Sequence, residues 1–296
     1  MISTLKDISN KIAKPVADAL IDITAVAGEL ELPFFVVGAT ARDIVFSELF
    51  DVRTNRATLD VDLGIRVNSW DEYARLIVRL MESGAFAKTD KQMQRLKSRG
   101  GVLVDVIPFG NIEHPAGIIS WPPHNDIIMK TIGFEEGLQH STKVTIAHDP
   151  DVVINVCTPA SLTVMKLIAW HDRNTMNAKD ATDILFLLSQ YINAGNENRL
   201  YATDRDIHEE EDFDFERASA RLLGRDVRKI SSAETLGAIL NILESETSEN
   251  SQFRLLSDMS GKEWTGEPTG ERNLMLLNQF KKGIKEEMKP LTQTNQ

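Results

Sequence analysis

The chain has 296 residues, of which 42% are hydrophobic and 26% are charged, so it is long enough to bury a sizeable core. Its formal net charge of −11 argues against a surface that coats nucleic acid broadly, although it is compatible with a local basic groove. The single cysteine, Cys157, excludes an intrachain disulfide and fits a reducing compartment.

The amino-terminal sequence MISTLKDISNKIAKPV lacks the apolar core of a signal peptide. The sequence nowhere approaches the roughly 18 consecutive apolar residues that a membrane-spanning helix needs. We therefore expect a cytoplasmic protein with no membrane partner.

Helical and strand patterns alternate through the first third of the chain. Apolar residues at helical spacing over residues 4–30 predict two helical pieces, with Pro15 as the break between them. The alternating and capped patterns that follow predict a strand at 32–39, a helix at 40–50, a strand at 57–67, a capped helix at 69–84 and a hairpin at 93–110.

The pattern changes after this region. Residues 110–150 are rich in loops, with short strands at 126–133 and 143–148, and another strand follows at 152–157. Two apolar helices are predicted at 158–173 and 178–194, and the acidic stretch 196–216 is either a linker or the start of an exposed helix. We therefore expect an α/β domain over residues 1–157 and a helical domain over residues 158–296.

Two carboxylates interrupt an apolar strand. Alternation places Asp60 and Asp62 on one face of that strand, where like charges repel unless a cation lies between them. Asp105 is a third lone acid in an apolar strand. Three carboxylates on adjacent strands would hold two Mg²⁺ ions about 4 Å apart, as in phosphoryl transfer. The alternative places Asp60 and Asp62 on the solvent face of an edge strand.

A turn of small residues precedes these carboxylates in the chain. Gly38, Ala39 and Thr40 follow a buried strand and open a helix, where backbone N–H groups and a hydroxyl suit a triphosphate. The spacing matches neither the Rossmann fingerprint nor the Walker motif. Arg42 and Asp43, which come next, either contribute to this site or form a structural pair at the start of the helix.

Two polar features stand out in the predicted helices after residue 158. Lys166 interrupts the apolar run LTVMKLIAW, which indicates either a functional cation or a lysine whose stem is buried and whose ammonium reaches water. Asp180 and Asp183 lie one turn apart at the start of the next helix, where acids also stabilise the helix dipole.

Four segments together resemble the AbiEii/AbiGii-type nucleotidyltransferases, which belong to the DNA polymerase β-like superfamily and include toxins of bacterial toxin–antitoxin systems. The segments are VVGATARDIV, LDVDLGI, VLVDVIPFG and LTVMKLIAWHDRNTMNAKDATDILFLL, within residues 33–192. The resemblance implies an α+β fold: a small mixed-sheet nucleotidyltransferase core flanked by helices, followed by a helical domain that closes the nucleotide cleft.

The resemblance also implies roles for particular residues. Asp60, Asp62 and Asp105 would be the catalytic, metal-binding carboxylates, with Asp105 as a candidate base. The nucleotide-binding residues would be Gly38, Ala39, Thr40, Arg42, Lys166 and Asp180. The turn reads Gly-Ala where Gly-Gly or Gly-Ser is commoner in the family, and the Ala-Arg-Asp that follows Thr40 is similar to the CCA-adding branch.

The function we expect is transfer of a nucleoside monophosphate from an NTP to an acceptor hydroxyl, with Mg²⁺ or Mn²⁺ as cofactor. The acceptor is either RNA or protein, a cognate antitoxin is a candidate partner, and no DNA partner is expected. A local RNA track would draw on basic residues near the carboxylates, namely Arg53, Arg56, Arg66, Arg95, Lys97 and Arg99. The alternative is a non-catalytic module of the same fold that binds a nucleotide or a partner.

Overall fold

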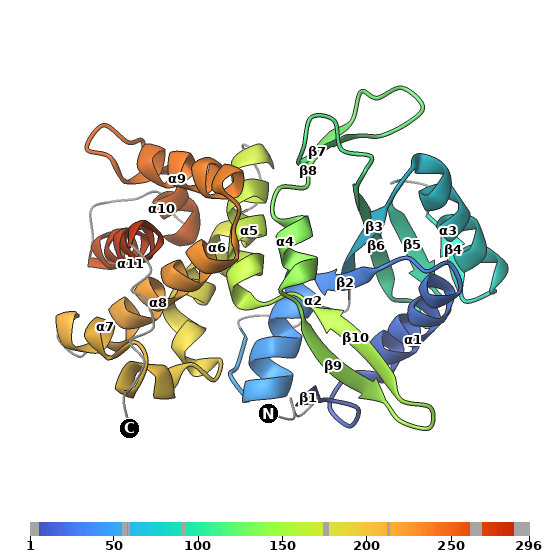
Figure 1. Ribbon diagram of the computed structural model, residues 1–296, viewed down its shortest axis with the longest axis horizontal. Helices are drawn as coiled ribbons and strands as arrows, with labels where there is room; N and C mark the ends of the chain where they lie inside the picture. The colour runs from blue at the N-terminus through green and yellow to red at the C-terminus, as the bar shows by residue number, and fades with distance from the viewer. Residues whose placement is uncertain are drawn as a thin grey trace, which may run out of the picture. The chain divides into compact units, whose positions relative to one another are not determined.

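A computed structural model describes residues 6–54, 58, 60–89, 93–173, 178–211, 214–260 and 268–286 (Figure 1). The chain divides into two compact units, Met1–Met176 with Asn193–Gly195, and Asn177–Ile192 with Asn196–Gln296. The sequence pattern places the boundary between residues 157 and 158, one helix earlier. The difference arises because α5 (Pro159–Arg173) packs on helices α2 and α4 of the first unit.

Within the described residues, the first unit is built on a mixed eight-stranded sheet with the order β1-β9-β10-β2-β3-β6-β5-β4. The central strands β3 and β6 are parallel, and β2 and β5 flank them in antiparallel pairings. The strands of the sheet are β1 (Lys6–Asp7), β2 (Phe34–Val37), β3 (Val61–Val67), β4 (Phe86–Lys88), β5 (Arg95–Ser98), β6 (Leu103–Gly110), β9 (Thr142–Ala147) and β10 (Val152–Val156).

The remaining strands and helices of the first unit lie around this sheet. A separate hairpin consists of β7 (Ile118–Ser120) and β8 (Ile128–Lys130). Besides α5, the helices are α1 (Lys14–Glu29), α2 (Gly38–Asp43), a π-helical continuation of α2 (Ile44–Leu49), α3 (Trp70–Glu82) and α4 (Phe134–Gln139). The mixed sheet flanked by helices confirms the predicted α+β fold class.

Alternation along β3 gives the sheet two different faces. Val61, Leu63 and Ile65 are buried on one face, which is covered by α1 and α3, two helices in contact with each other. The opposite face carries Asp62 and Gly64. A Cβ on Gly64 would lie only 2.4 Å from Phe35 and 3.0 Å from Phe134 of α4, so the missing side chain lets these two rings pack over the strand. The carboxylate face therefore points toward α4.

The beginning of the chain differs from the prediction. Of the segment 4–30, in which two helical pieces are expected, the described residues 6–30 contain one α-helix, because β1 pairs with β9 through Lys6 and Asp7. Pro15 lies in the first turn of α1, where its missing N–H has no intrahelical acceptor to lose. It therefore begins the helix and does not interrupt one.

An exposed histidine bridges β1 and the turn between β9 and β10. The Nε2 atom of His148 lies 2.9 Å from Oδ2 of Asp7, and its Nδ1 atom lies 2.6 Å from Oδ1 of Asp151. Hydrogen bonding to Asp151 and then to Asp7 raises the pKa of His148 to about 9. The imidazolium therefore ties the amino-terminal strand to the sheet near neutral pH.

The stabilisation from this bridge is expected to depend on pH. It should be complete below about pH 6.5, the ordinary pKa of histidine, and should disappear as the pH rises through about 9. Thermal unfolding of the wild type and His148→Gln between pH 6 and pH 10 tests this, with His124→Gln as the control for an exposed histidine elsewhere. A stability gap between wild type and His148→Gln that stays constant up to pH 10 contradicts the prediction.

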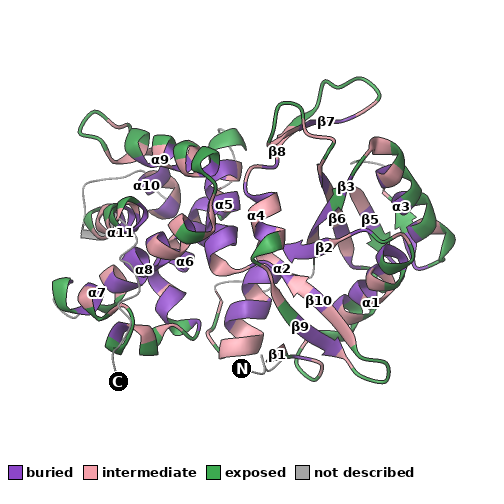
Figure 2. Cartoon of the chain, viewed as in Figure 1, coloured by how far each residue is buried: buried purple, intermediate pink, exposed green. Residues whose placement is uncertain are grey.

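The second unit is helical within its described residues. Its helices are α6 (Lys179–Gln190), α7 (Arg205–Glu210), α8 (Phe215–Ile230), α9 (Ala233–Thr247), α10 (Arg254–Ser260) and α11 (Pro268–Lys285), with short 3-10 turns at Tyr191–Asn193 and Glu197–Tyr201. Figure 2 shows buried residues along α6 and α8, and the core includes Leu222, Leu223, Leu276 and Phe280.

The described residues 196–211 of the acidic stretch pack against α8, whereas the sequence leaves the stretch 196–216 as a linker or the start of a helix. The Nη1 atom of Arg221 donates to Oε1 of Glu211 at 2.8 Å, and the Nη2 atom of Arg225 donates to Oδ2 of Asp206 at 2.7 Å. Arg221 and Glu211 are both buried, which makes this pair costly to break on one side only. The acidic residues therefore neutralise arginines of α8.

Helices α8 and α11 approach each other through two glycines. A Cβ on Gly283 would lie 2.1 Å from the carbonyl oxygen of Arg221, and a Cβ on Gly224 would lie 2.2 Å from that of Phe280. Backbone atoms cannot move aside as a flexible side chain can. The closeness of the two helices therefore depends on these glycines.

Gly283→Ala is expected to destabilise the second unit by about 3 kcal/mol, because the added methyl group forces α8 and α11 apart. The matched control is Gly237→Ala in α9, where a Cβ would meet nothing within 4 Å. Removing a helical glycine at such an open position should stabilise the protein by up to about 1 kcal/mol. Urea unfolding of both variants measures the two effects, and changes of the same sign would contradict the prediction.

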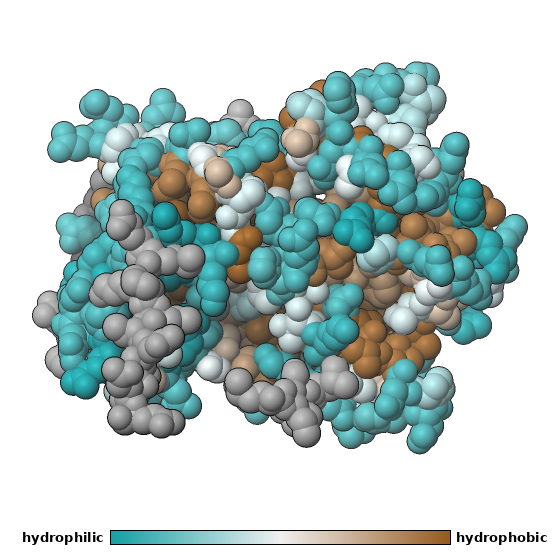
Figure 3. Space-filling view, viewed as in Figure 1, coloured by the Kyte–Doolittle hydropathy of each residue, from teal (hydrophilic) through white to brown (hydrophobic). Residues whose placement is uncertain are grey.

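None of the helices in the described part of the chain has the length and apolarity that crossing a membrane requires. On the face drawn in Figure 3, hydrophilic residues cover most of the surface and hydrophobic residues gather in smaller areas between them.

Candidate active site

The turn from β2 into α2 lies directly against the carboxylate of Asp62. Val37, the last residue of β2, pairs with Asp62 across the two strands. The next residue, Gly38, has a φ of +66°, and a Cβ there would lie 2.1 Å from Oδ2 of Asp62. Glycine therefore satisfies two requirements here: a backbone conformation that other residues rarely adopt, and space for the carboxylate.

Thr40 connects this turn to the residue before β3. Its Oγ1 hydroxyl donates to the carbonyl oxygen of Asp60 at 2.5 Å, and its side chain is buried. Ala39, between Gly38 and Thr40, is half-buried in the first turn of α2. The sequence suggests that this hydroxyl holds phosphate. In the structure it donates its hydrogen bond to the backbone and fixes the position of Asp60 relative to the turn.

The pairing of β3 with β6 brings two of the predicted carboxylates together. Asp62 and Asp105 are register partners in these parallel strands, so their side chains share one face. Burial, and then repulsion from Asp105, raise the pKa of Asp62 to about 6, and Asp60 adds a weaker repulsion. Asp60 itself is exposed immediately before β3. The three acids therefore form one electrostatically coupled group on the α4 side of the sheet.

Two cations of α5 act on the same carboxylate. Lys166 and Arg173 both lower the pKa of Asp62, although burial and Asp105 outweigh them. Lys166 is half-buried between the buried residues Met165 and Leu167. Its interaction with Asp62 favours the functional interpretation over a lysine that only reaches toward solvent.

Asp105 is bound by an arginine of the neighbouring strand. The Nε atom of Arg95 donates to Oδ1 of Asp105 at 2.7 Å, and its Nη2 atom donates to Oδ2 at 2.5 Å. The two side chains are 29% and 16% exposed, so the pair is largely shielded from water. Asp60 and Asp62 also interact electrostatically with this guanidinium. Arg95 is therefore the counter-ion of the acidic group.

In the sequence, Arg95 is named only as one of six basic residues of a candidate RNA track near the carboxylates. A usable signal was present in the predicted hairpin, whose turn is centred on Gly100. Residues equally distant from a hairpin turn face each other, and the observed register pairs Arg95 with Asp105 and Lys97 with Leu103. Counting outward from the turn would have identified the pair.

Arg42 has a structural role in this arrangement. Its side chain is 2% exposed, and its Nη2 atom lies 2.7 Å from Oδ1 of Asp43. Oδ2 of Asp43 in turn accepts from the backbone N–H of Thr58 at 3.2 Å. The sequence leaves two interpretations open, and this geometry favours the structural pair, because the guanidinium is buried against a carboxylate.

Asp180 lies in the second compact unit. It is buried in the first turn of α6, as is Asp183 one turn later. The other predicted site residues, from Gly38 to Lys166, all belong to the first unit. A role for Asp180 opposite the carboxylates therefore stays a prediction.

The negative charge of the acidic group suits a divalent cation. The described ranges contain no set of three or more histidine, cysteine, aspartate or glutamate side chains arranged to hold a metal ion. The charge of Asp62 is nevertheless not fully compensated in the protein, because burial and two acidic neighbours raise its pKa. Asp60 and Asp62 are the oxygen donors suited to Mg²⁺, whereas both oxygens of Asp105 accept from Arg95.

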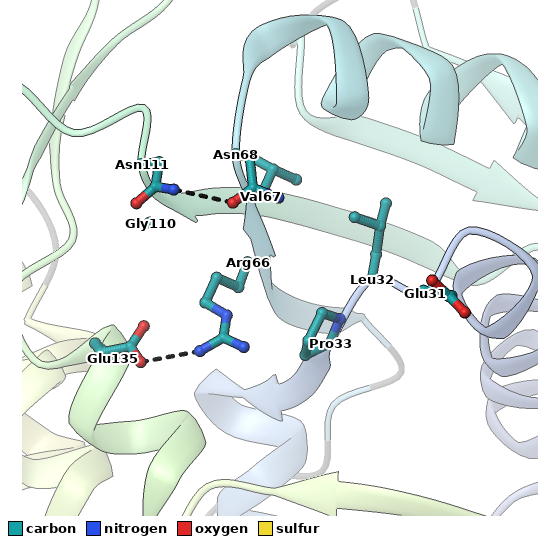
Figure 4. A pocket seen from close by; sticks show the side chains of 9 residues that line it. All are labelled: Glu31, Leu32, Pro33, Arg66, Val67, Asn68, Gly110, Asn111 and Glu135. Carbon is teal, nitrogen blue, oxygen red and sulfur yellow. Dashed lines mark hydrogen bonds and ion pairs between the residues drawn. The ribbon is translucent and has the colours of Figure 1, made fainter.

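A cavity of about 410 Å³ lies at the other end of the same strands (Figure 4). It lies where β3 and β6 end, and Nη1 of Arg66 meets Oε1 of Glu135 there at 3.2 Å. Its lining residues are Glu31, Leu32, Pro33, Arg66, Val67, Asn68, Gly110, Asn111 and Glu135. None of the predicted catalytic or nucleotide-binding residues is among them.

Several solved structures are similar to this chain, each at low sequence identity. A nucleotidyltransferase-like antigenic protein from Paracoccidioides brasiliensis is 16% identical, covering 67% of this chain and 92% of its own, with a TM-score of 0.37. The antibiotic-resistance factor ANT(2'')-Ia is 12% identical, with 67% and 100% covered and a TM-score of 0.37. The CCA-adding enzyme from Thermotoga maritima is 13% identical, with 94% and 84% covered and a TM-score of 0.27.

No protein among those with curated functions matches the chain. A family model described as "Nucleotidyl transferase AbiEii toxin, Type IV TA system" matches residues 22–253. The match includes all the carboxylates of the acidic group, the glycine turn, Lys166 and most of the helical unit. The chain therefore belongs to the AbiEii family of nucleotidyltransferases.

Proposed function

We propose that this protein is a Mg²⁺-dependent nucleotidyltransferase that moves a nucleoside monophosphate from an NTP to an acceptor hydroxyl. The observation that carries the proposal is the contact between the Gly38 turn and Asp62, whose register partner is Asp105. This contact brings backbone N–H groups suited to phosphate next to carboxylates suited to a cation. Mn²⁺ is expected to support the same reaction in place of Mg²⁺.

In this proposal, Asp60 and Asp62 would hold the cation, and the chemistry it would supply is neutralisation of charge on the triphosphate. Gly38 and Ala39 offer backbone N–H groups to the phosphates, and Thr40 holds Asp60 in place through its carbonyl oxygen. Lys166 adds positive charge on the Asp62 side of the site. Arg42 contributes indirectly, because its pair with Asp43 stabilises the beginning of α2.

The proposed reaction forms a bond between the acceptor oxygen and the α-phosphorus and breaks the bond from that phosphorus to the β-phosphate bridge, so pyrophosphate leaves. The acceptor hydroxyl must lose its proton as it attacks. Asp105 is the proposed base, a role that requires at least one of its oxygens to be released by Arg95. Asp180 is proposed to orient groups from the helical unit.

We further propose a toxin role with a cognate antitoxin as partner, which the description of the family as a toxin of a toxin–antitoxin system supports, and a location in the cytoplasm. The acceptor is proposed to be RNA or a protein. Lys97 supports a polyanionic acceptor, because alternation places this lysine on the same face of β5 as the Arg95–Asp105 pair.

The test is a transfer assay with each of the four NTPs labelled at the α-phosphate, with Mg²⁺ and with or without total cellular RNA. Label in RNA, in the protein or in a small product is expected, and the double variant Asp60→Ala, Asp62→Ala should abolish it. Transfer that persists in this variant would overturn the proposal. Mg·NTP binding without any labelled product would favour the alternative, a non-catalytic binding module of the same fold.

A further inference from the structure

We propose that Arg95 competes with divalent cations for Asp105, so that the third carboxylate of the site becomes a metal ligand only when the guanidinium releases it. This inference rests on the proposed function, because it concerns the same cation site. It adds a residue that limits cation affinity and that the sequence motifs of the family resemblance do not contain.

The geometry supports competition because the guanidinium satisfies both oxygens of the carboxylate. Arg95 Nε and Nη2 each donate to a different oxygen of Asp105, at 2.7 Å and 2.5 Å. Such a two-pronged pair is stronger and more directional than a single ion pair. A cation that binds Asp105 must displace at least one of these hydrogen bonds.

The backbone holds the pair in place. Arg95 and Asp105 are register partners in the antiparallel strands β5 and β6. On its other side, β6 pairs with β3 so that Asp105 faces Asp62. Asp105 therefore lies between the guanidinium of Arg95 and the carboxylate of Asp62. Its own carboxylate can pair either with Arg95 or with a cation bound beside Asp62.

Arg95 compensates the negative charge of the acidic group when no cation is bound. The acidic group contains three carboxylates, and in the absence of a divalent cation their mutual repulsion opposes folding. Arg95 interacts with all three of them. It therefore stabilises the cation-free protein, and the same interaction weakens cation binding.

The primary test measures Mn²⁺ binding by electron paramagnetic resonance of the free ion, in the absence of nucleotide. Arg95→Gln is expected to bind Mn²⁺ about tenfold more tightly than the wild type, because the charged hydrogen bonds to Asp105 no longer have to be broken. The matched control is Lys97→Gln, which removes the same charge from an exposed position on the same strand face. It should change the affinity much less than Arg95→Gln does.

A double-mutant cycle separates competition at Asp105 from a general effect of charge. In an Asp105→Asn background, Arg95→Gln should produce only the small change seen for Lys97→Gln. Arg95→Lys, which keeps the charge but loses the two-pronged geometry, should fall between the wild type and Arg95→Gln. Equal effects of Arg95→Gln and Lys97→Gln, or an undiminished effect in the Asp105→Asn background, would overturn the inference.

The same titrations distinguish failure of this inference from failure of the proposed function. If the wild type binds Mn²⁺ and Asp62→Asn does not, the cation site stands whatever Arg95 does. If neither protein binds Mn²⁺, and Arg95→Gln does not bind it either, the proposed cation site itself is wrong. Thermal unfolding of Arg95→Gln provides the folding control, since it should be less stable than the wild type without Mn²⁺ and should regain stability when Mn²⁺ is added.

Discussion

Asp62→Asn is expected to abolish nucleotidyl transfer and, at the same time, to make the cation-free protein more stable. Transfer should fall by about 1,000-fold or more, because a lost metal ligand removes several kcal/mol of transition-state stabilisation. Stability should rise because burial and the charge of Asp105 make the ionised carboxylate unfavourable in the folded protein. Lys166 and Arg173 offset only part of this cost, since the pKa of Asp62 is still raised.

The gain in stability should depend on pH in a defined direction. The pKa of Asp62 is about 6 in the folded protein and 3.8 in the unfolded chain, so the folded state holds a proton between these values that the unfolded state has lost. The stability of the wild type therefore falls as the pH rises through this window. The advantage of Asp62→Asn should be small at pH 4 and should reach about 3 kcal/mol above pH 6.

Thermal unfolding in a chelating buffer between pH 4 and pH 8 measures this difference. Asp126→Asn provides the control, because it removes the same charge from an exposed loop residue. Adding Mg²⁺ should reverse the order of stability, since the cation binds the wild type and not the variant. A variant less stable than the wild type at pH 8 without cations would show that Asp62 is a net stabilising residue.

Gly38→Ala is expected to reduce transfer by at least about 100-fold and to destabilise the first unit by about 2–3 kcal/mol. The added methyl group would lie 2.1 Å from Oδ2 of Asp62, so the turn and the carboxylate cannot both keep their positions. The φ of +66° adds backbone strain for any residue with a Cβ. A displacement of about 1 Å at the reacting centre costs about two orders of magnitude in rate.

Gly84→Ala separates the two causes of this effect. Gly84 has a φ of +72°, close to that of Gly38, but a Cβ there would meet nothing within 4 Å. Gly84→Ala should therefore show the backbone strain alone, about 1 kcal/mol of lost stability, with transfer unchanged. Urea unfolding and initial-rate measurements on both variants give the comparison. If both variants lose stability equally and retain transfer, the contact between Gly38 and Asp62 has no role in the site.

The strand face of Asp62 and the turn at Gly38 could be predicted from the sequence because both depend on the local pattern of residues. The alternation of β3 predicts that Asp62 differs in face from Leu63, and the structure confirms this. The small-residue turn at Gly38 is likewise recognisable from the residues around it. Periods of two and of 3.6 residues follow from backbone geometry, so a short segment contains all that is needed to predict its element and its faces.

Other features of the structure depend on partners far away in the chain. Residues 6–7 form a strand because β9 offers an open edge, and no pattern within residues 4–12 contains that information. Arg42 is buried and pairs with Asp43, which in turn accepts a hydrogen bond from the backbone N–H of Thr58, fifteen residues further along the chain. The boundary between the units lies after α5 because that helix packs on α2 and α4.

The sequence by itself determined the family, the class of fold, the strand faces and the set of acidic residues that make a cation site worth proposing. Only the tertiary structure decided how these residues are arranged: Asp62 packed against Gly38, Asp105 held by Arg95, and Thr40 bound to the carbonyl oxygen of Asp60. The physical reason is that a side chain's face depends on its own strand, whereas its charge state and hydrogen-bond partners depend on strands and helices far away in the chain.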